Sequence, residues 1–365
     1  MGLLPVAAAL LAQAAAAPRP RFPLPHFRTT NFTQMGNLPT GLGPDAGGQG
    51  GYVAPAFLSN GFHGLRLGPI PFLADPYAGT SRPSGPYPGG TPTVPAVLAG
   101  YLHRDPKGRQ RVLAAAPFPF ETAIRVGDTL LSNRTARLVT VLAQSFDMRD
   151  GTLRTSLVFA DRDGSAGPWS LQINVTQFAS RSDPTLVAMR IATRAEPPHL
   201  SVSLSPAISL GGVPGEPQND TTPIPNWTWD PCETLSLVSD CGSRMGLTAK
   251  AQLRNGTAPG TLRYDLIASS VAGDAYSPQD PMLAAYTAME KGLYIGGFDE
   301  LAARNRAAWA ELWRSRITFD GPGFTATDQQ MLDTAFFCEP PPPLPLATQS
   351  TYTHTRHMSC RSDRC

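Results

Sequence analysis

The feature that most constrains the fold is a series of short segments in which apolar and polar residues alternate. Trp169 to Phe178 (WSLQINVTQF) places Leu171, Ile173 and Val175 on one face and polar residues on the other. Side chains of a β-strand point alternately to its two faces, so this spacing predicts a strand with one face buried. A chain built from such segments needs a second layer to cover the apolar face.

Turn sequences join these segments into hairpins. Met148-Arg149-Asp150-Gly151 separates Arg137–Phe146 from Thr152–Phe159, and an Asp-Gly step adopts the positive φ of a tight hairpin at low cost. Ser182-Asp183-Pro184 stands in the same position before the partner segment Leu186–Thr193. Further strand-like runs follow at 199–210, 235–238, 246–253 and 262–270.

Strands at this spacing, without amphipathic helices between them, predict a mainly β fold. We expect a large antiparallel β-sandwich over residues 51–275. The Pro- and Gly-rich stretches 75–95 and 211–231 are interpreted as long surface loops.

Helical periodicity occurs only late in the chain. Asp280-Pro281 opens a segment through Glu290 with apolar residues at helical spacing, and proline is well tolerated at a first helical position. Phe298–Arg316 is longer and carries Trp309 and Trp313, four residues apart, on its apolar stripe. These patterns predict a short helical linker over residues 276–319.

A third helix is expected to begin within residues 320–337. Thr327-Asp328-Gln329-Gln330 has the form of a capping box. Pro340 to Pro343 cannot continue that helix, because proline lacks the N–H donor and clashes with the preceding turn. Residues 338–365 show no apolar periodicity and are predicted to be a disordered tail. Our hypothesis is that the reading frame or splice pattern changes near Phe337, so that the product is truncated.

The first residues resemble an export signal. Residues 1–17 contain an apolar run followed by Ala14–Ala17, which is typical of a secretory signal peptide and too short for a membrane-spanning helix. The alternative is an Ala-rich N-terminal helix or tether. Residues 18–50 are rich in Pro and Gly and are predicted to form a loose arm.

Six Asn-x-Thr sequons support export. We therefore expect a glycoprotein that is secreted, or delivered through the secretory pathway to the cell wall, vacuole or lysosome. The predicted N-glycosylation sites are Asn31, Asn133, Asn174, Asn219, Asn226 and Asn255.

Composition argues against several classes of partner. Charged residues make up 16% of the chain and the net charge is +2, without the basic stripe that nucleic-acid binding needs. We expect no nucleic acid, no membrane and no cofactor as a partner, and the sequence leaves the oligomeric state open. The histidines lack metal-ligand spacing, and no CxxC pair is present.

The five cysteines suggest one local disulfide. Cys232 and Cys241 are the candidate pair in an oxidising compartment, provided that their Cα atoms come within bridging distance. The other three cysteines lie in the tail.

Two tryptophans and one histidine are candidates for a substrate groove. Trp227 and Trp229 suit sugar stacking, but a loop folded onto the edge of the sandwich is the favoured alternative, because buried aromatics are commoner. For His63, a packed histidine is likewise the favoured alternative. The aspartates at 147, 150, 161 and 163 cluster near turns, and turn chemistry explains them without a catalytic role.

Three motifs resemble glycoside hydrolase family 65. Leu58–Arg66 (LSNGFHGLR) looks like that family's Asn-Gly-aromatic-x-Gly-x-Arg segment, which adds Arg66 to the candidate groove residues. Ala307–Trp313 (AAWAELW) resembles its helical linker, and Asp328–Phe336 (DQQMLDTAF) resembles its first barrel helix. The resemblance covers roughly residues 50 to 337.

The resemblance implies a super-β-sandwich, a helical linker and an (α/α)6 catalytic barrel. The secreted members that it most suggests are acid trehalases, with the glucosylgalactosyl-hydroxylysine glucosidases as close cousins. Family hydrolases invert the glycosidic bond with two carboxyls about 6.5–9.5 Å apart. No residue of this chain matches either carboxyl, so no catalytic residue is assigned, and an α-glucoside is the implied ligand of the parent enzyme.

Three hypotheses about function remain open. The chain is an incomplete α-glucosidic hydrolase of the trehalase type that is inactive alone, a carbohydrate-binding or domain-assembly module, or a non-functional product of a disrupted gene. Turnover of trehalose, calorimetry with glucosides and the quality of secretion distinguish them.

Overall fold

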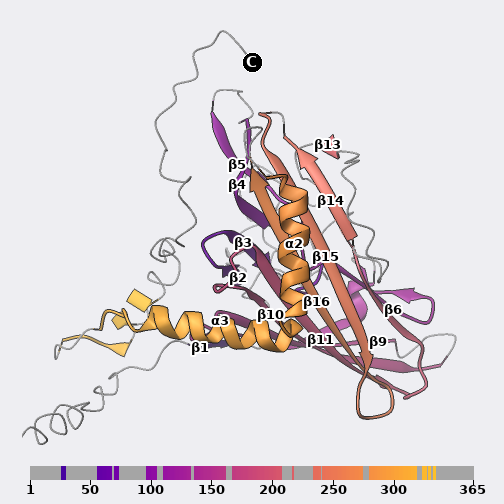
Figure 1. The fold of residues 1–365 in the computed structure, drawn as a ribbon. Helices are drawn as coiled ribbons and strands as arrows, with labels where there is room; N and C mark the ends of the chain where they lie inside the picture. The colour runs from indigo at the N-terminus through magenta and orange to yellow at the C-terminus, as the bar shows by residue number, and fades with distance from the viewer. Residues whose placement is uncertain are drawn as a thin grey trace, which may run out of the picture.

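The computed structural model is mainly β, as the alternation of the sequence predicts (Figure 1). Within the described residues the strands form three antiparallel sheets, and two α-helices follow them. No helix of this described part is both long and apolar enough to cross a membrane. The structure describes residues 26–29, 56–67, 70–73, 96–104, 110–132, 135–161, 167–207, 216–217, 233–239, 241–273, 279–318, 323–326, 328–329 and 332–333.

The largest sheet has nine strands in the order β1-β8-β9-β10-β11-β16-β15-β14-β13. Most neighbours are hairpin partners, whereas β11 pairs with β16 and so joins two distant parts of the chain. The strands are β1 (His26–Thr29), β8 (Val139–Asp147), β9 (Thr152–Asp161), β10 (Trp169–Ala179), β11 (Leu186–Glu196), β13 (Glu216–Pro217), β14 (Glu233–Val238), β15 (Arg244–Asn255) and β16 (Thr261–Gly273).

Both edge strands of this sheet lie where the sequence predicts no strand. Strand β1 belongs to the predicted loose arm and pairs with residues 144–147 of β8. Strand β13 falls inside the predicted surface loop 211–231 and pairs with β14. Strands of four and two residues are too short to show alternation, and their pairing depends on an exposed ladder of the neighbouring strand.

Two smaller sheets complete the sandwich. One has the order β2-β3-β4-β5 and the other the order β12-β6-β7. Their strands are β2 (Ala56–Ser59), β3 (His63–Leu67), β4 (Ala96–Arg104), β5 (Arg111–Ala115), β6 (Thr122–Val126), β7 (Thr129–Leu130) and β12 (Val202–Pro206).

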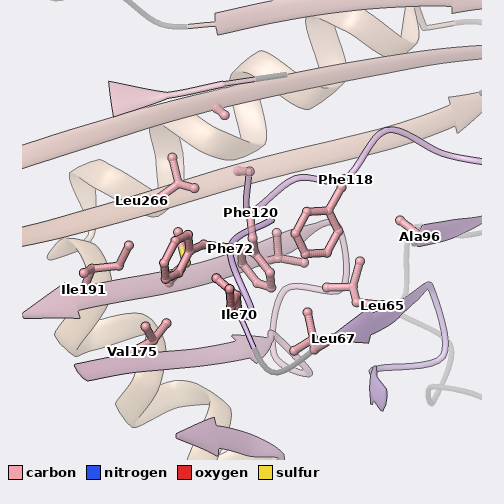
Figure 2. Close-up of a cluster of buried hydrophobic side chains, with 14 of the residues drawn as sticks. Leu65, Leu67, Ile70, Phe72, Ala96, Phe118, Phe120, Val175, Ile191 and Leu266 are labelled. Carbon is pink, nitrogen blue, oxygen red and sulfur yellow. The ribbon is translucent and has the colours of Figure 1, made fainter. Parts of the chain in front are cut away.

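The main core lies between the inner face of the nine-stranded sheet and these smaller sheets. Figure 2 shows aromatic side chains of the connecting segments, among them Phe72 and Phe120, beside Val175 and Ile191 of the large sheet. Both phenylalanines are fully buried. Complete burial of a large apolar side chain contributes roughly 1.5–3 kcal/mol, so these segments join the layers of the sandwich.

The predicted hairpin at Asp150-Gly151 is confirmed. Asp147 pairs with Thr152 across the turn, and Gly151 adopts a φ of 61° that favours glycine. The start of β8 differs from the prediction, because Ala136–Leu138 form a 3-10 turn, η2, before the strand begins at Val139.

Two helices pack on the outer face of the nine-stranded sheet. Helix α2 (Pro281–Tyr294) begins as predicted, with Pro281 in its first turn and the Asp280 carboxylate accepting from the Met282 amide at 2.7 Å. Helix α3 (Gly297–Trp313) follows after a short turn. Phe298 of α3 and Phe178 of β10 meet edge to face, with ring centroids 5.4 Å apart, and anchor the helix on the sheet.

Arginines of the sheet hold the start of α3. Arg190 donates to both oxygens of Asp265, at 2.6 and 3.0 Å, and to Asp299 of α3 at 2.6 Å. Arg263 bridges the same two aspartates, and the Arg190 guanidinium lies 4.1 Å from the Phe298 ring centroid. Burial raises the pKa of Asp265, and the hydrogen bond from Arg190 opposes that rise. Because anions are favoured at a helix N-terminus, Asp299 also suits its first-turn position.

The segment after α3 is fixed by a buried ion pair. Arg316 donates to both oxygens of Asp333 at 2.8 and 2.6 Å, and the two side chains are 7% and 1% exposed. A reciprocal cap joins Thr325 and Asp328, where the Asp328 carboxylate accepts from the Thr325 amide at 2.8 Å and Thr325 Oγ1 accepts from the Asp328 amide. This cap lies two residues before the predicted box, whose Thr327 and Gln330 are outside the described residues. The predicted box at Thr327 and Gln330 therefore stays a prediction.

Candidate functional site: the junction between the sandwich and helix α3

The turn between β2 and β3 is organised by one buried asparagine, Asn60, which is 6% exposed. Its Nδ2 donates to the carbonyls of Ser180 and Pro184 at 2.6 and 2.9 Å. Its Oδ1 accepts from the amides of Phe62 and His63 at 2.9 and 2.8 Å. The side chain thus holds its own turn in shape and ties it to the β10–β11 turn, more than 100 residues further along the chain.

His63 lies in the same cluster and is 3% exposed. Its Nδ1–H donates to the Pro184 carbonyl at 2.9 Å, and its Nε2 has no hydrogen-bond partner among the described residues. Burial lowers the pKa of His63 to about 4, and the Pro184 carbonyl opposes this shift. His63 is therefore a neutral, packed histidine here.

The predicted substrate groove is only partly placed. Arg66 lies in β3 opposite Phe57, but its side chain is outside the described residues, as are Trp227 and Trp229. A groove role for His63, Arg66 and the two tryptophans stays a prediction.

Asn305 of α3 holds two turns of the nine-stranded sheet. Its Oδ1 accepts from the Arg181 amide at 2.9 Å, and its Nδ2 donates to the Asp150 carbonyl at 2.6 Å. The side chain is 1% exposed. The β10–β11 turn is thus held by Asn60 on one side and by Asn305 on the other.

Two tryptophans complete the attachment of α3. Trp309 is 0% exposed and stacks on Trp313, with ring centroids 6.4 Å apart. Trp313 Nε1–H donates to the Met148 carbonyl at 2.9 Å. The Arg181 guanidinium lies 5.1 Å from the Trp309 ring centroid, and burial lowers the pKa of this arginine. A Cβ on Gly151 would come within 2.6 Å of the Trp309 indole nitrogen, so the close approach of helix and hairpin requires glycine.

Buried carboxylates near the turns are engaged by arginines. Asp147 accepts from the Arg149 guanidinium at 2.8 and 3.1 Å and from its amide at 3.0 Å, and this hydrogen bonding raises the pKa of Arg149. Asp150 faces Arg154 at 3.5 Å, and Asp163 lies outside the described residues. Asp147 and Asp150 are thus engaged locally at the β8–β9 turn, in keeping with the turn role that the sequence suggests. Among the described residues, no group of three or more potential ligands is placed to hold a metal ion.

The disulfide between Cys232 and Cys241 stays a prediction, because the structure describes only one of the two cysteines. Cys241 is a free thiol whose Sγ–H donates to the Leu102 carbonyl at 3.1 Å, and Cys232 lies outside the described residues.

Two of the six sequons fall within the described residues, and both asparagines are exposed. Asn174 lies in the middle of β10 and Asn255 at the end of β15. The other four asparagines are outside the described residues, so their glycosylation stays a prediction.

Sequence reasoning missed the two asparagines that organise this junction. Asn60 lies within the Leu58–Arg66 motif and Asn305 within the predicted helix Phe298–Arg316, but the sequence pattern assigns no role to either side chain. A polar residue at a position predicted to be buried could have identified them. Buried amides are nearly always hydrogen-bonded, so such a residue indicates a contact that organises the fold.

Comparisons with known proteins identify the fold. No known family profile matches the chain, and no curated protein sequence matches it. Among solved structures, a "putative kojibiose phosphorylase from human microbiome" matches with a TM-score of 0.56 and 11% sequence identity. The match covers 87% of this chain and 42% of that protein, so the chain spans less than half of its length. The chain therefore shares the β-sandwich and helix arrangement of one part of that protein.

Proposed function

We propose that this chain supplies the β-sandwich and helical linker of a secreted enzyme that acts on α-glucosidic bonds, and that its own function is to hold a catalytic domain in place. Kojibiose phosphorylases belong to family 65, the family that the three sequence motifs resemble. The shared fold and the motifs support the substrate class. Hydrolysis of α,α-trehalose is the finer proposal, and it comes from the resemblance to secreted family members.

The observation that carries the proposal is the rigid attachment of α3. A flexible linker would leave two domains free to move, whereas Asn305 and Trp313 fix this helix to the turn between β8 and β9 through hydrogen bonds at 2.6 and 2.9 Å. Ile317 and Phe324, just beyond the helix, are 60% and 43% exposed. Rigid elements position a functional domain more accurately than loops do.

The buried carboxylates of the described residues are consistent with a chain that holds a catalytic domain and does not itself carry out catalysis. Asp147, Asp265 and Asp333, which are 1–7% exposed, are each bound by an arginine. An inverting glycosidase instead needs one protonated and one ionised carboxyl facing each other across a substrate and a water. A carboxylate whose oxygens accept from an arginine of the same fold is not free to face a second carboxyl across a substrate.

The test is an assay of the purified chain with α,α-trehalose and with kojibiose, each with and without inorganic phosphate. We expect neither free glucose nor glucose 1-phosphate to form. Turnover of either disaccharide by these residues alone would overturn the supporting role. Calorimetry with the same sugars is the second measurement. Saturable heat without turnover would favour a carbohydrate-binding module instead.

A further inference from the structure

The outer face of the nine-stranded sheet is only partly covered by helices. Helices α2 and α3 pack on Phe178, Ala188 and Ile267. Further along the same face of β10 and β11, Asn174 and Ala192 are exposed. We call this uncovered part, centred on Asn174, the open outer face.

A row of short side chains crosses the open outer face. Asn174 pairs with Ser156 of β9 and with Ala192 of β11, and Ser156 pairs with Ala143 of β8. Directly paired side chains on one face lie about 4.5–5.5 Å apart, so these four residues form a continuous row across four strands.

The rows on either side carry longer side chains. Thr176 is paired with Arg154 and Arg190, and Gln172 with Arg194. A flat ring placed on the row of Asn174 therefore meets short side chains below it. Arg190 is held by Asp265 and Asp299, but the exposed guanidinium groups of Arg154 and Arg194 at the rim can donate to hydroxyl and carbonyl oxygens.

The Asn174 side chain is held in one orientation on this face. Ser156 Oγ–H donates to Asn174 Oδ1 at 2.7 Å, which fixes the side chain. Its Nδ2 makes no hydrogen bond with another described residue. The sequon hydroxyl, Thr176, lies on the same face two residues further along β10.

We propose that Asn174 carries an N-linked glycan whose first sugar lies flat on this row, so that the open outer face is the solvent-facing side of the assembled protein. This inference rests on the secretory part of the proposed function. An N-linked glycan is bulky and excludes another protein from the face that carries it. A catalytic domain held by the chain therefore docks on another face.

The transfer balances with one co-reactant, a lipid-diphosphate-linked oligosaccharide. Asn174 Nδ2 forms a bond to C1 of the terminal N-acetylglucosamine, and the bond from C1 to the diphosphate oxygen breaks. The lipid diphosphate leaves with the electron pair, and one Nδ2 proton passes to a base of the transferase. Oδ1 remains a carbonyl oxygen, so the hydrogen bond from Ser156 is retained.

Asn255 provides an internal comparison. It is exposed in the last residue pair of the β15–β16 hairpin, opposite Leu262, and the following residues of the turn are exposed as well. A glycan there has no sheet surface beneath its first sugar and stays accessible.

The experiment expresses the full chain in eukaryotic secretory cells and reads site occupancy by glycopeptide mass spectrometry. We expect glycans at Asn174 and Asn255. Thr176→Val keeps a β-branched residue in the strand and should remove only the Asn174 glycan. Thr176→Ser should retain that glycan, and Asn255→Gln should remove only the other glycan.

The rate of glycan release tests the packed first sugar. Peptide N-glycosidase should release the Asn174 glycan from native protein about tenfold more slowly than the Asn255 glycan, because release from a packed site needs local opening. Denaturation should remove the difference.

Three results would overturn the inference. A bare Asn174 in chains that carry a glycan at Asn255 excludes the glycan and leaves the secretory route intact. Equal release of the two glycans from native protein excludes the packed first sugar. Two bare asparagines in a chain that never enters the secretory pathway overturn the glycan together with the secretory part of the proposed function, while the supporting role of the sandwich is tested separately by the sugar assays.

Discussion

At the scale of single residues, the junction depends on buried polar groups whose partners lie far away in sequence. Asn60 makes four hydrogen bonds, and His63 beside it makes one. A buried carbonyl that loses its donor bears a desolvation cost of about 1–3 kcal/mol. These side chains therefore contribute more to stability than their size suggests.

Replacement of Asn60 tests this directly. Asn60→Ala removes the donors to Ser180 and Pro184 and should lower the free energy of unfolding by about 2–4 kcal/mol. Chemical denaturation measures the loss. Asn255→Ala, at an exposed position, is the matched control and should stay within about 0.5 kcal/mol of wild type. Equal stability of the two variants would show that the Asn60 contacts are dispensable.

His63 should make stability depend on pH. Its pKa is lowered from 6.5 to about 4 in the folded chain, so between these values the unfolded chain binds a proton first. Its contribution is fully present above pH 6.5 and is lost as the pH falls toward 4. The shift corresponds to about 3 kcal/mol.

The measurement is the unfolding free energy of wild type and His63→Asn between pH 7.5 and 4. Asparagine places an amide N–H where Nδ1–H stands, and it does not titrate, so the variant should lose less stability on acidification. His199→Asn, at an exposed position, should follow the wild-type curve. Parallel curves for wild type and His63→Asn would contradict the prediction.

At the scale of elements, helix α3 and the β8–β9 hairpin meet through one glycine. Gly151→Ala places a Cβ against Trp309 and forces alanine into a positive φ. The backbone strain costs about 1–2 kcal/mol, and the overlap should add about 1–3 kcal/mol. Gly127→Ala is the control, because Gly127 also has a positive φ but nothing lies within 4 Å of its added Cβ.

Denaturation midpoints of the two alanine variants distinguish strain from overlap. A loss no greater for Gly151→Ala than for Gly127→Ala would mean that the indole moves aside without cost.

The elements that the sequence predicted are those with a local signal. Leu171–Thr176 alternates between buried and more exposed residues, the Asp150-Gly151 turn requires positive φ, and Asp280 and Pro281 mark a helix start. The short edge strands β1 and β13 have no such pattern. These strands form because a neighbouring strand offers unpaired backbone N–H and C=O groups. The residue pattern within one short segment carries no information about that neighbour.

The candidate site was less predictable, because its contacts are long-range. Asn60 and Ser180 are 120 residues apart, and Asn305 and Asp150 are 155 residues apart. The motif around Asn60 marked a special turn, but only the fold identifies the second turn to which it is tied.

At the scale of the whole molecule, three kinds of contact join the sandwich to its helices. Helices α2 and α3 share an apolar cluster with β10, β11 and β16, Arg190 and Arg263 hold Asp299, and Asn305 joins two turns. Contacts of this kind couple elements into one cooperative unit. A supporting domain whose linker melted independently could not fix the position of a partner.

Cooperativity is the last prediction. Unfolding followed by far-ultraviolet circular dichroism reports mainly the sheets. Tryptophan fluorescence in a Trp169→Phe, Trp227→Phe, Trp229→Phe background reports Trp309 and Trp313, the two tryptophans that remain. The two transitions should coincide in this background. Asn305→Ala should make the fluorescence transition occur earlier, because it leaves the Asp150 carbonyl without its donor and loosens α3 by about 1–3 kcal/mol. Arg304→Ala, at the neighbouring exposed position, should leave the transitions together. Separate transitions without the Asn305 change would mean that α3 is not part of the rigid sandwich, and the supporting role would lose its physical basis.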